Sequence, residues 1–133
     1  MAVVENITVL FTDLVDSTQL AAALSPQAAD DLRRVHFSGL REAIAASGGT
    51  EVKNLGDGVM VAFASTSAAL SCAVAMQQAL DQENRDRTQP LAMRIGLSVG
   101  EATREGDDYF GDPVIEAARL CGQASGGQIL EPS

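Results

Sequence analysis

Residues 51–63, with the sequence EVKNLGDGVMVAF, contain two short runs of strand-forming residues on either side of Gly56-Asp57-Gly58. Apolar and β-branched residues flanking a glycine-rich turn are typical of a tight hairpin. We therefore predict strands at 50–55 and 59–63, with Asp57 at the tip of the hairpin. Loop tips often carry functional residues, because they are exposed and supported by rigid neighbouring elements.

A further strand is predicted upstream at residues 7–13, ITVLFTD, where side chains alternate along the run and Asp13 lies at its end. A short helical stretch at 17–24 follows. A longer helix then begins at Ser25-Pro26 and ends at Gly48-Gly49, the residues expected at a helix start and a helix end. The predicted buried stripe of the longer helix is Leu32, Val35, His36, Leu40 and Ala43.

The remaining chain continues the alternation of helices and strands. We predict a helix at 67–82, an exposed connection at 81–89, a strand at 91–99, a polar loop or hairpin at 100–108, a helix at 112–121 and a short strand at 128–130. This order predicts an α+β protein with a ferredoxin-like antiparallel sheet and helices covering one face. At 133 residues, positions 1–133 are expected to form a single domain.

Charge and composition exclude several classes of protein. The chain carries 18 acidic and 9 basic residues, a formal charge of -9, and no Lys/Arg cluster, so we expect no nucleic-acid partner and no membrane contact from this segment. No apolar run reaches membrane-spanning length and no signal peptide is recognisable, which indicates a cytoplasmic protein. Cys72 and Cys121 are too few and too far apart for a disulfide framework or a zinc site, and both are expected in the core.

The two carboxylates at the strand end and the hairpin tip would be neighbours if their strands were adjacent at the centre of the sheet. Paired aspartates suit Mg²⁺, which takes one or two protein carboxylates together with substrate phosphates. After Asp13 the chain enters a helix, whose first N–H groups are expected to be free to bind phosphate oxygens. These groups belong to Val15, Asp16, Ser17 and Thr18. Taken singly, Asp13 or Asp16 is more often a helix N-cap, and Gly56-Asp57-Gly58 is more often an ordinary turn.

Three blocks of sequence together narrow these alternatives. FTDLVDST at 11–18, EVKNLGDGVMVAF at 51–63 and GDDYFGDPVIEAARL at 106–120 resemble the signature blocks of class III adenylate and guanylate cyclases. The resemblance covers nearly the whole chain. It implies a head-to-tail homodimer with two shared sites, in which Asp13 and Asp57 hold two Mg²⁺ or Mn²⁺ ions while ATP is converted to 3′,5′-cyclic AMP and pyrophosphate.

The resemblance also assigns roles to residues from the opposite protomer. Lys53 and Asp108 match the positions that read adenine, because a lysine donates to N1 and a carboxylate accepts from the N6 amino group. Arg119 matches the arginine that stabilises charge on the transferring phosphate. The position four residues earlier, where the family usually has a ribose-binding asparagine, is Ile115 here, and the chain ends at Ser133 without a match to the family's later basic residue.

These departures keep other hypotheses open. A weakly active or inactive nucleotide-binding regulatory module with a cyclase fold is the main alternative. An enzyme resembling a diguanylate cyclase or a polymerase palm is a minor one, since no GG[DE]EF block occurs at the hairpin. His36 is expected to be a hydrogen-bonded core or interface histidine rather than a base. Tyr109 and Phe110 either pack near the purine or anchor their loop in the core.

Overall fold

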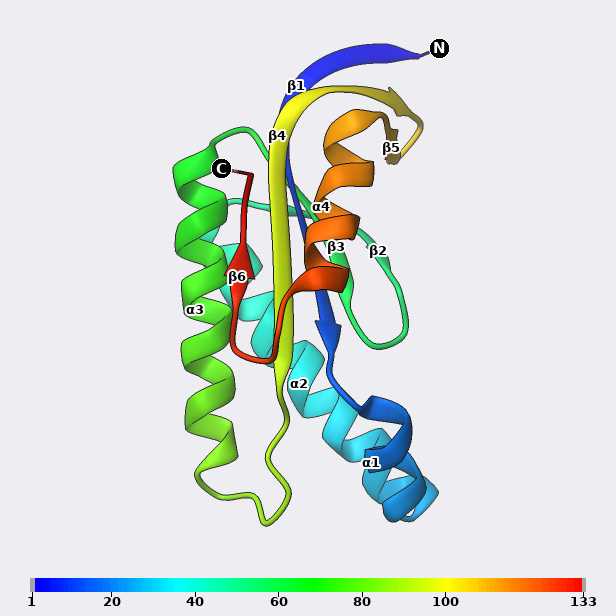
Figure 1. The fold of residues 1–133 in the computed structure, drawn as a ribbon, viewed down its shortest axis with the longest axis vertical. Helices are drawn as coiled ribbons and strands as arrows, with labels where there is room; N and C mark the ends of the chain where they lie inside the picture. Colours follow the sequence, from blue (N-terminus) through cyan, green and yellow to red (C-terminus); the bar gives the residue numbers. More distant parts are fainter. Residues whose placement is uncertain (1, 133) are drawn as a thin grey trace.

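The computed structural model describes residues 2–132. Along the chain its elements are β1 (Val3–Leu14), α1 (Ser17–Ala23), α2 (Pro26–Ser47), β2 (Thr50–Asn54), β3 (Val59–Phe63), α3 (Thr66–Asn84), β4 (Met93–Glu105), β5 (Asp108–Phe110), α4 (Asp112–Gln123) and β6 (Ile129–Leu130) (Figure 1). Every predicted helix and strand is therefore present. The strand predicted at 7–13 is longer at both ends, and the helix predicted at 67–82 continues into what was expected to be a connection.

The sheet places β1 at its centre. The strand order is β2-β3-β1-β4-β5, with β6 pairing β4 on a separate branch. β1 runs antiparallel to β3 on one side and to β4 on the other, while only the β4–β6 pair is parallel. The predicted adjacency of the first strand and the hairpin is therefore confirmed.

Helices cover both faces of the sheet, so the prediction that they cover one face was wrong. In Figure 1, α4 lies on the opposite side of the sheet from α2 and α3. Leu10 and Leu14 of β1 pack into the cluster that contains α2 and α3, whereas Val9 and Phe11 pack into a second cluster with Ala117 and Cys121 of α4. This division follows from the alternation of side chains along a strand. Thr8 and Thr12 are on the same face of β1 as Leu10 and are buried although they are polar, so the sequence resembled a strand with only one covered face.

Gly96 on β4 allows α4 to lie against the sheet. A Cβ atom at this position would be 2.2 Å from the backbone nitrogen of Cys121 and 2.5 Å from the backbone oxygen of Ala117. Real carbon atoms do not approach backbone atoms this closely, so any larger residue would push α4 away from β4. The glycine therefore fixes the distance between the second helical layer and the sheet.

α2 has the predicted ends but a different buried stripe. Ser25 accepts a hydrogen bond from the N–H of Ala28 at 3.2 Å, and Gly48 ends the helix in the left-handed conformation. Val35 was predicted to be buried and is half exposed. The buried residues are His36, Phe37, Leu40, Ala43 and Ile44, which share one helix face that contacts α3 and the sheet.

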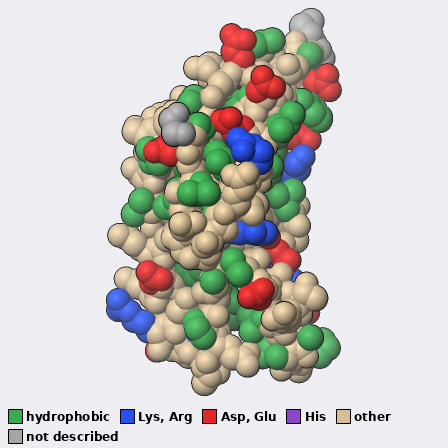
Figure 2. Space-filling model, viewed as in Figure 1, with side chains coloured by type: hydrophobic (Ala, Val, Ile, Leu, Met, Phe, Trp, Pro, Cys, Tyr) green, Lys and Arg blue, Asp and Glu red, His purple; other side chains and the backbone are tan. Residues whose placement is uncertain are grey.

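The segment predicted as a polar loop or hairpin at 100–108 is mostly strand. β4 continues to Glu105, turns at Gly106-Asp107 and pairs with β5, an antiparallel hairpin that curls over at one end of the sheet (Figure 1). Within residues 2–132 no helix is long and apolar enough to cross a membrane. On the face shown in Figure 2, basic side chains lie singly or beside acidic ones.

Candidate active site

The two aspartates at the predicted metal site are brought together by backbone contacts on either side of Asp13. The hydroxyl of Thr12 accepts a hydrogen bond from the N–H of Val59 at 3.1 Å, and the N–H of Leu14 donates to the backbone oxygen of Asp57 at 3.2 Å. Gly58 permits this approach, since a Cβ atom there would be 1.7 Å from the oxygen of Thr12. The hairpin tip is therefore held against the end of β1.

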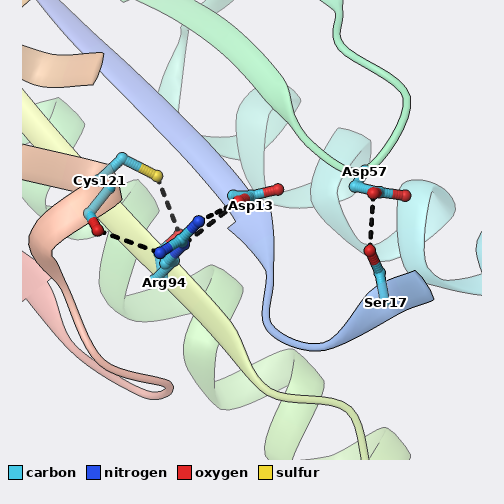
Figure 3. Close-up of polar contacts among 6 residues, drawn as sticks. Asp13, Ser17, Asp57, Arg94 and Cys121 are labelled. Atoms are coloured by element: carbon cyan, nitrogen blue, oxygen red, sulfur yellow. Dashed lines mark hydrogen bonds and ion pairs between the residues drawn. The ribbon is translucent and has the colours of Figure 1, made fainter. Parts of the chain in front are cut away.

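Asp13 is paired with Arg94, which sequence analysis did not identify. Two nitrogens of the guanidinium group donate to Oδ2 of Asp13 at 2.6 and 3.2 Å, and a third donates to the backbone oxygen of Gly122 at 3.1 Å (Figure 3). The hydrogen bond to Asp13 raises the pKa of Arg94 above its usual value. Arg94 lies opposite Asp13 in the β1–β4 register, so only knowledge of that register would have revealed it.

Asp57 has two side-chain partners, one for each of its oxygens. The hydroxyl of Ser17 donates to Oδ2 at 2.7 Å, and Nη2 of Arg33 lies 3.3 Å from Oδ1 (Figure 3 shows the serine contact). Ser17 begins α1 and Arg33 belongs to α2, so the hairpin tip contacts both helices. Sequence analysis placed Ser17 near this site only through its backbone and did not identify Arg33.

The donor set fits a hard divalent cation. Asp13 and Asp57 are 36% and 37% exposed, so both carboxylates are accessible from solvent. In the described chain no group of three His, Cys, Asp or Glu side chains is arranged to hold a metal ion. Two carboxylates with further ligands from water and phosphate are the pattern that Mg²⁺ uses in nucleotide sites.

The turn after Asp13 only partly matches its prediction. The N–H of Val15 donates to the backbone oxygen of Ala92 at 2.8 Å, so this group is not free to bind phosphate and the prediction for Val15 was wrong. Leu14 lies opposite Met93 in the antiparallel β1–β4 register, so this contact continues that pairing by one residue. Asp16 adopts the left-handed conformation (φ 57°) and precedes α1, and its side chain makes no capping hydrogen bond.

Lys53 and Asp108 form an ion pair, although 55 positions separate them. Nζ of Lys53 donates to Oδ2 of Asp108 at 3.0 Å, and the N–H of Tyr109 donates to Oδ1 at 2.8 Å. The hydrogen bond from Lys53 lowers the pKa of Asp108 below its usual value, which keeps the carboxylate ionised. The hydroxyl of Tyr109 donates to Glu5 of β1 at 3.0 Å, so this aromatic residue anchors β5 to the sheet.

The exposed side of α4 carries Ile115 and Arg119. Arg119 is more than half exposed, and its only ion pair in the described chain is a long contact of 3.7 Å with Glu116 one turn earlier. Ile115 is 67% exposed. Glu116 accepts a hydrogen bond from Ser98 at 2.8 Å, which fixes it to β4. Within one chain Arg119 therefore contacts neither the aspartate pair nor Lys53 and Asp108.

His36 and both cysteines are buried, and the thiol of Cys121 donates to the backbone oxygen of Arg94 at 3.5 Å (Figure 3). Burial lowers the pKa of His36 to about 4, and Nε2 has no hydrogen-bond partner in the part of the chain that the structure describes. The prediction of a core histidine is confirmed, but the expected hydrogen bond at this nitrogen is absent. Cys72 and Cys121 are buried and free, as predicted, and burial raises the pKa of Cys121 to about 11. Burial keeps both thiols protonated, so neither is a reactive thiolate, and the imidazole of His36 is closed off from solvent.

Comparison with known proteins assigns this arrangement to a family. The family model described as "Adenylate and Guanylate cyclase catalytic domain" matches residues 1–131. The chain therefore belongs to the class III adenylate and guanylate cyclase domains, and its resemblance to that family in sequence is confirmed.

Individual relatives include cyclases of both specificities. The solved guanylyl cyclase Cya2 has 28% identity and a TM-score of 0.88, covering 98% of this chain and 76% of that one. An adenylate cyclase of Mycosarcoma maydis is 35% identical over 94% of this chain. A solved adenylate/guanylate cyclase/hydrolase from Silicibacter pomeroyi has 32% identity and a TM-score of 0.87, covering 98% of this chain and 77% of that one. The adenylyl cyclase CyaB from P. aeruginosa has 28% identity and a TM-score of 0.87, covering 98% and 78%.

The curated relatives are much longer than the region they share with this chain. The chain spans 6% of the length of the M. maydis adenylate cyclase and 31% of a relative from Mycobacterium bovis. The shared region is therefore the cyclase domain alone.

Proposed function

We propose that this domain converts ATP to 3′,5′-cyclic AMP and pyrophosphate, at two equivalent sites in a head-to-tail homodimer. The observation that carries the choice of ATP is the pair formed by Lys53 and Asp108, a donor and an ionised acceptor 3.0 Å apart. Membership of the cyclase family supplies the reaction class, and this pair supplies the preference for adenine.

The chemistry of the pair favours adenine over guanine. Lys53 has three donor hydrogens and uses one on Asp108, so it can also donate to adenine N1. Asp108 remains ionised and can accept from the N6 amino group. Guanine presents an N–H donor and a carbonyl acceptor at the same two positions, so both contacts would become repulsive.

Asp13 and Asp57 are the residues that would hold two Mg²⁺ or Mn²⁺ ions. Such ions, when bound, activate a hydroxyl nucleophile and neutralise negative charge on the phosphates. Arg94 holds Asp13 through two hydrogen bonds and so fixes its carboxylate at the end of β1. The backbone N–H groups of Asp16, Ser17 and Thr18 remain candidates for phosphate oxygens.

Arg119 is proposed to stabilise charge on the transferring phosphate from the opposite protomer. Its side chain is exposed and weakly paired within its own chain, which suits a residue that acts in a neighbouring one. Two-fold symmetry then gives two identical sites, each with Asp13 and Asp57 from one protomer and Lys53, Asp108 and Arg119 from its partner. Such stabilisation of charge is strongest where water is excluded, as between two protomers.

The test is direct measurement of products. Purified protein is incubated with ATP or GTP in Mg²⁺ or Mn²⁺, and cyclic nucleotides are quantified beside an Asp57→Ala variant. We expect cyclic AMP from ATP, little cyclic GMP from GTP, and neither product from the variant. Equal use of both nucleotides would contradict the proposed role of Lys53 and Asp108, even if the protein is an active cyclase.

A weakly active nucleotide-binding module is the second candidate. The observation that favours it is Ile115, whose exposed side chain lies one turn before Arg119 and cannot donate a hydrogen bond to a ribose. Binding of ATP without measurable turnover, in a preparation shown to be folded and dimeric, would select this function over catalysis.

A further inference from the structure

Arg33 is the feature of this structure that the proposed reaction leaves without a role. It lies on the helix face that carries Phe37, Leu40 and Ile44, the residues that pack α2 into the core. One turn before this apolar stripe, its guanidinium group instead reaches Asp57 at 3.3 Å. The packing that orients α2 against the core therefore also directs Arg33 toward the hairpin tip.

Charge balance around the aspartates is the first step of the argument. The cluster consists of Asp13 and Asp57 with Arg94 and Arg33, two negative and two positive groups. The chain has only nine basic residues in a net charge of -9, and two of them lie on these carboxylates. Such a cluster offers carboxylates to the metal and guanidinium groups to the phosphate oxygens of a metal–polyphosphate complex.

The two arginines differ in how firmly they are held. Arg94 makes three hydrogen bonds of 3.2 Å or less and is 31% exposed. Arg33 has one contact, at 3.3 Å, in the described chain and is 45% exposed. A guanidinium group has five N–H donors, so most of those on Arg33 are available. Moving Arg33 away from Asp57 therefore costs fewer hydrogen bonds than moving Arg94 away from Asp13.

A cation bound by Asp57 would repel the guanidinium group beside it, because like charges a few ångströms apart destabilise each other. The nearest new partner would be the anion that the cation carries. We infer that Arg33 is a polyphosphate-binding residue, which leaves Asp57 when a metal–nucleotide complex binds and takes an oxygen of its triphosphate. This inference rests on the proposed assignment of Asp57 as a metal ligand.

Arg34 provides a matched control for the test. It is the adjacent arginine of α2, it is 73% exposed, and it pairs with Asp31 of its own helix at 2.7 Å. Arg33→Gln and Arg34→Gln thus remove the same charge from neighbouring positions, one directed at the site and one directed away from it. Long-range effects of net charge are equal in the two variants.

Binding of manganese tripolyphosphate, measured by titration calorimetry, tests the inference without catalysis. We expect Arg33→Gln to bind this probe roughly tenfold more weakly than the wild type, the loss of one charge-assisted hydrogen bond, and Arg34→Gln to stay within about twofold. Free Mn²⁺ should bind Arg33→Gln at least as tightly as the wild type, because Asp57 loses a competing cation. Arg33→Lys should recover part of the binding of the probe.

Three results would overturn the inference. The first is that the wild type does not bind the probe, and the second is that Arg33→Gln binds it as tightly as the wild type. The third is that Arg33→Gln also loses binding of free Mn²⁺, which would make Arg33 only a support for Asp57. Cyclic AMP formation is measured on the same preparations. Binding that depends on Arg33 in a chain that makes no cyclic AMP would support the inference and contradict the proposed reaction. Cyclic AMP formation by the wild type, together with normal binding of the probe by Arg33→Gln, would support the proposed reaction and contradict the inference.

Discussion

A mixture of two inactive variants should regain activity if each site is shared between protomers. Lys53 and Asp57 are four residues apart, yet Lys53 contacts Asp108 whereas Asp57 contacts Ser17 and Arg33. The two side chains therefore belong to different clusters of the same chain. In a head-to-tail dimer, Lys53 and Asp57 of one chain would serve different sites. Each site would take Asp57 from one protomer and Lys53 from its partner, so Asp57→Ala and Lys53→Ala should each remove one of these two groups.

The expected size of the recovery follows from symmetry. In a heterodimer of the two variants, one site contains both substitutions and the other contains neither. Each mixed dimer has one intact site of two, so isolated heterodimers should have about half of wild-type activity. Random assortment of equal amounts makes about half of the dimers mixed, so about a quarter should return in the unfractionated mixture. Each variant alone should have almost none, because every site in its homodimer lacks one group.

The assay uses differently tagged variants, co-purification through both tags to isolate heterodimers, and cyclic AMP formation from ATP. A mixture of Asp57→Ala with Asp13→Ala is the matched control, because both substitutions affect the same half of the site and no intact site can form. Absence of recovery in isolated heterodimers of Asp57→Ala and Lys53→Ala would refute the shared site. Recovery in the control mixture would refute the assignment of the two aspartates to one protomer.

Three further predictions concern the Lys53–Asp108 pair, Arg119 and His36. Replacing Lys53 with Glu and Asp108 with Ser should lower kcat/KM for ATP by at least about a hundredfold relative to that for GTP, measured with both substrates. Arg119→Ala should lower kcat by about 10²–10³-fold with little change in KM, measured from initial rates. His36→Leu should abolish the loss of stability that the wild type shows in acid. Since the folded-state pKa of His36 is about 4 and its ordinary value is 6.5, its contribution is present above pH 6.5 and lost as pH falls toward 4. The loss is about 3 kcal/mol at most, measured by urea unfolding across this range.

Each of these predictions has an outcome that contradicts it. Unchanged nucleotide preference would remove Lys53 and Asp108 from purine recognition. A rise in KM alone for Arg119→Ala would indicate uniform substrate binding rather than stabilisation of the transition state. If wild type and His36→Leu lose stability in parallel between pH 6.5 and 4, other groups cause the acid sensitivity and the histidine is not the group that takes up a proton on unfolding.

Much of the fold could be predicted because its signals are local. The hairpin at 51–63, the strand before Asp13 and both ends of α2 follow from turn residues, side-chain alternation and helix caps within a few positions of each other. The three signature blocks added the family, which comparison confirmed. Val35 was misplaced because a helical stripe can be drawn through several apolar positions, and the packing of α2 against α3 decides which stripe is buried.

The details of the site required the three-dimensional structure. Arg94 and Arg33 contact Asp13 and Asp57 across 81 and 24 positions, and nothing in their local sequence distinguishes them from other exposed arginines. The N–H of Val15 is bound by Ala92 because β1 and the approach to β4 run side by side.

The sequence by itself determined the elements, the identity of the chemical groups and the family, because these depend on short-range patterns and residue types. Only the tertiary structure decided which charges meet, which N–H groups stay free and which face α4 covers. These depend on the register between strands distant in the chain, where a shift of one residue would reverse every contact.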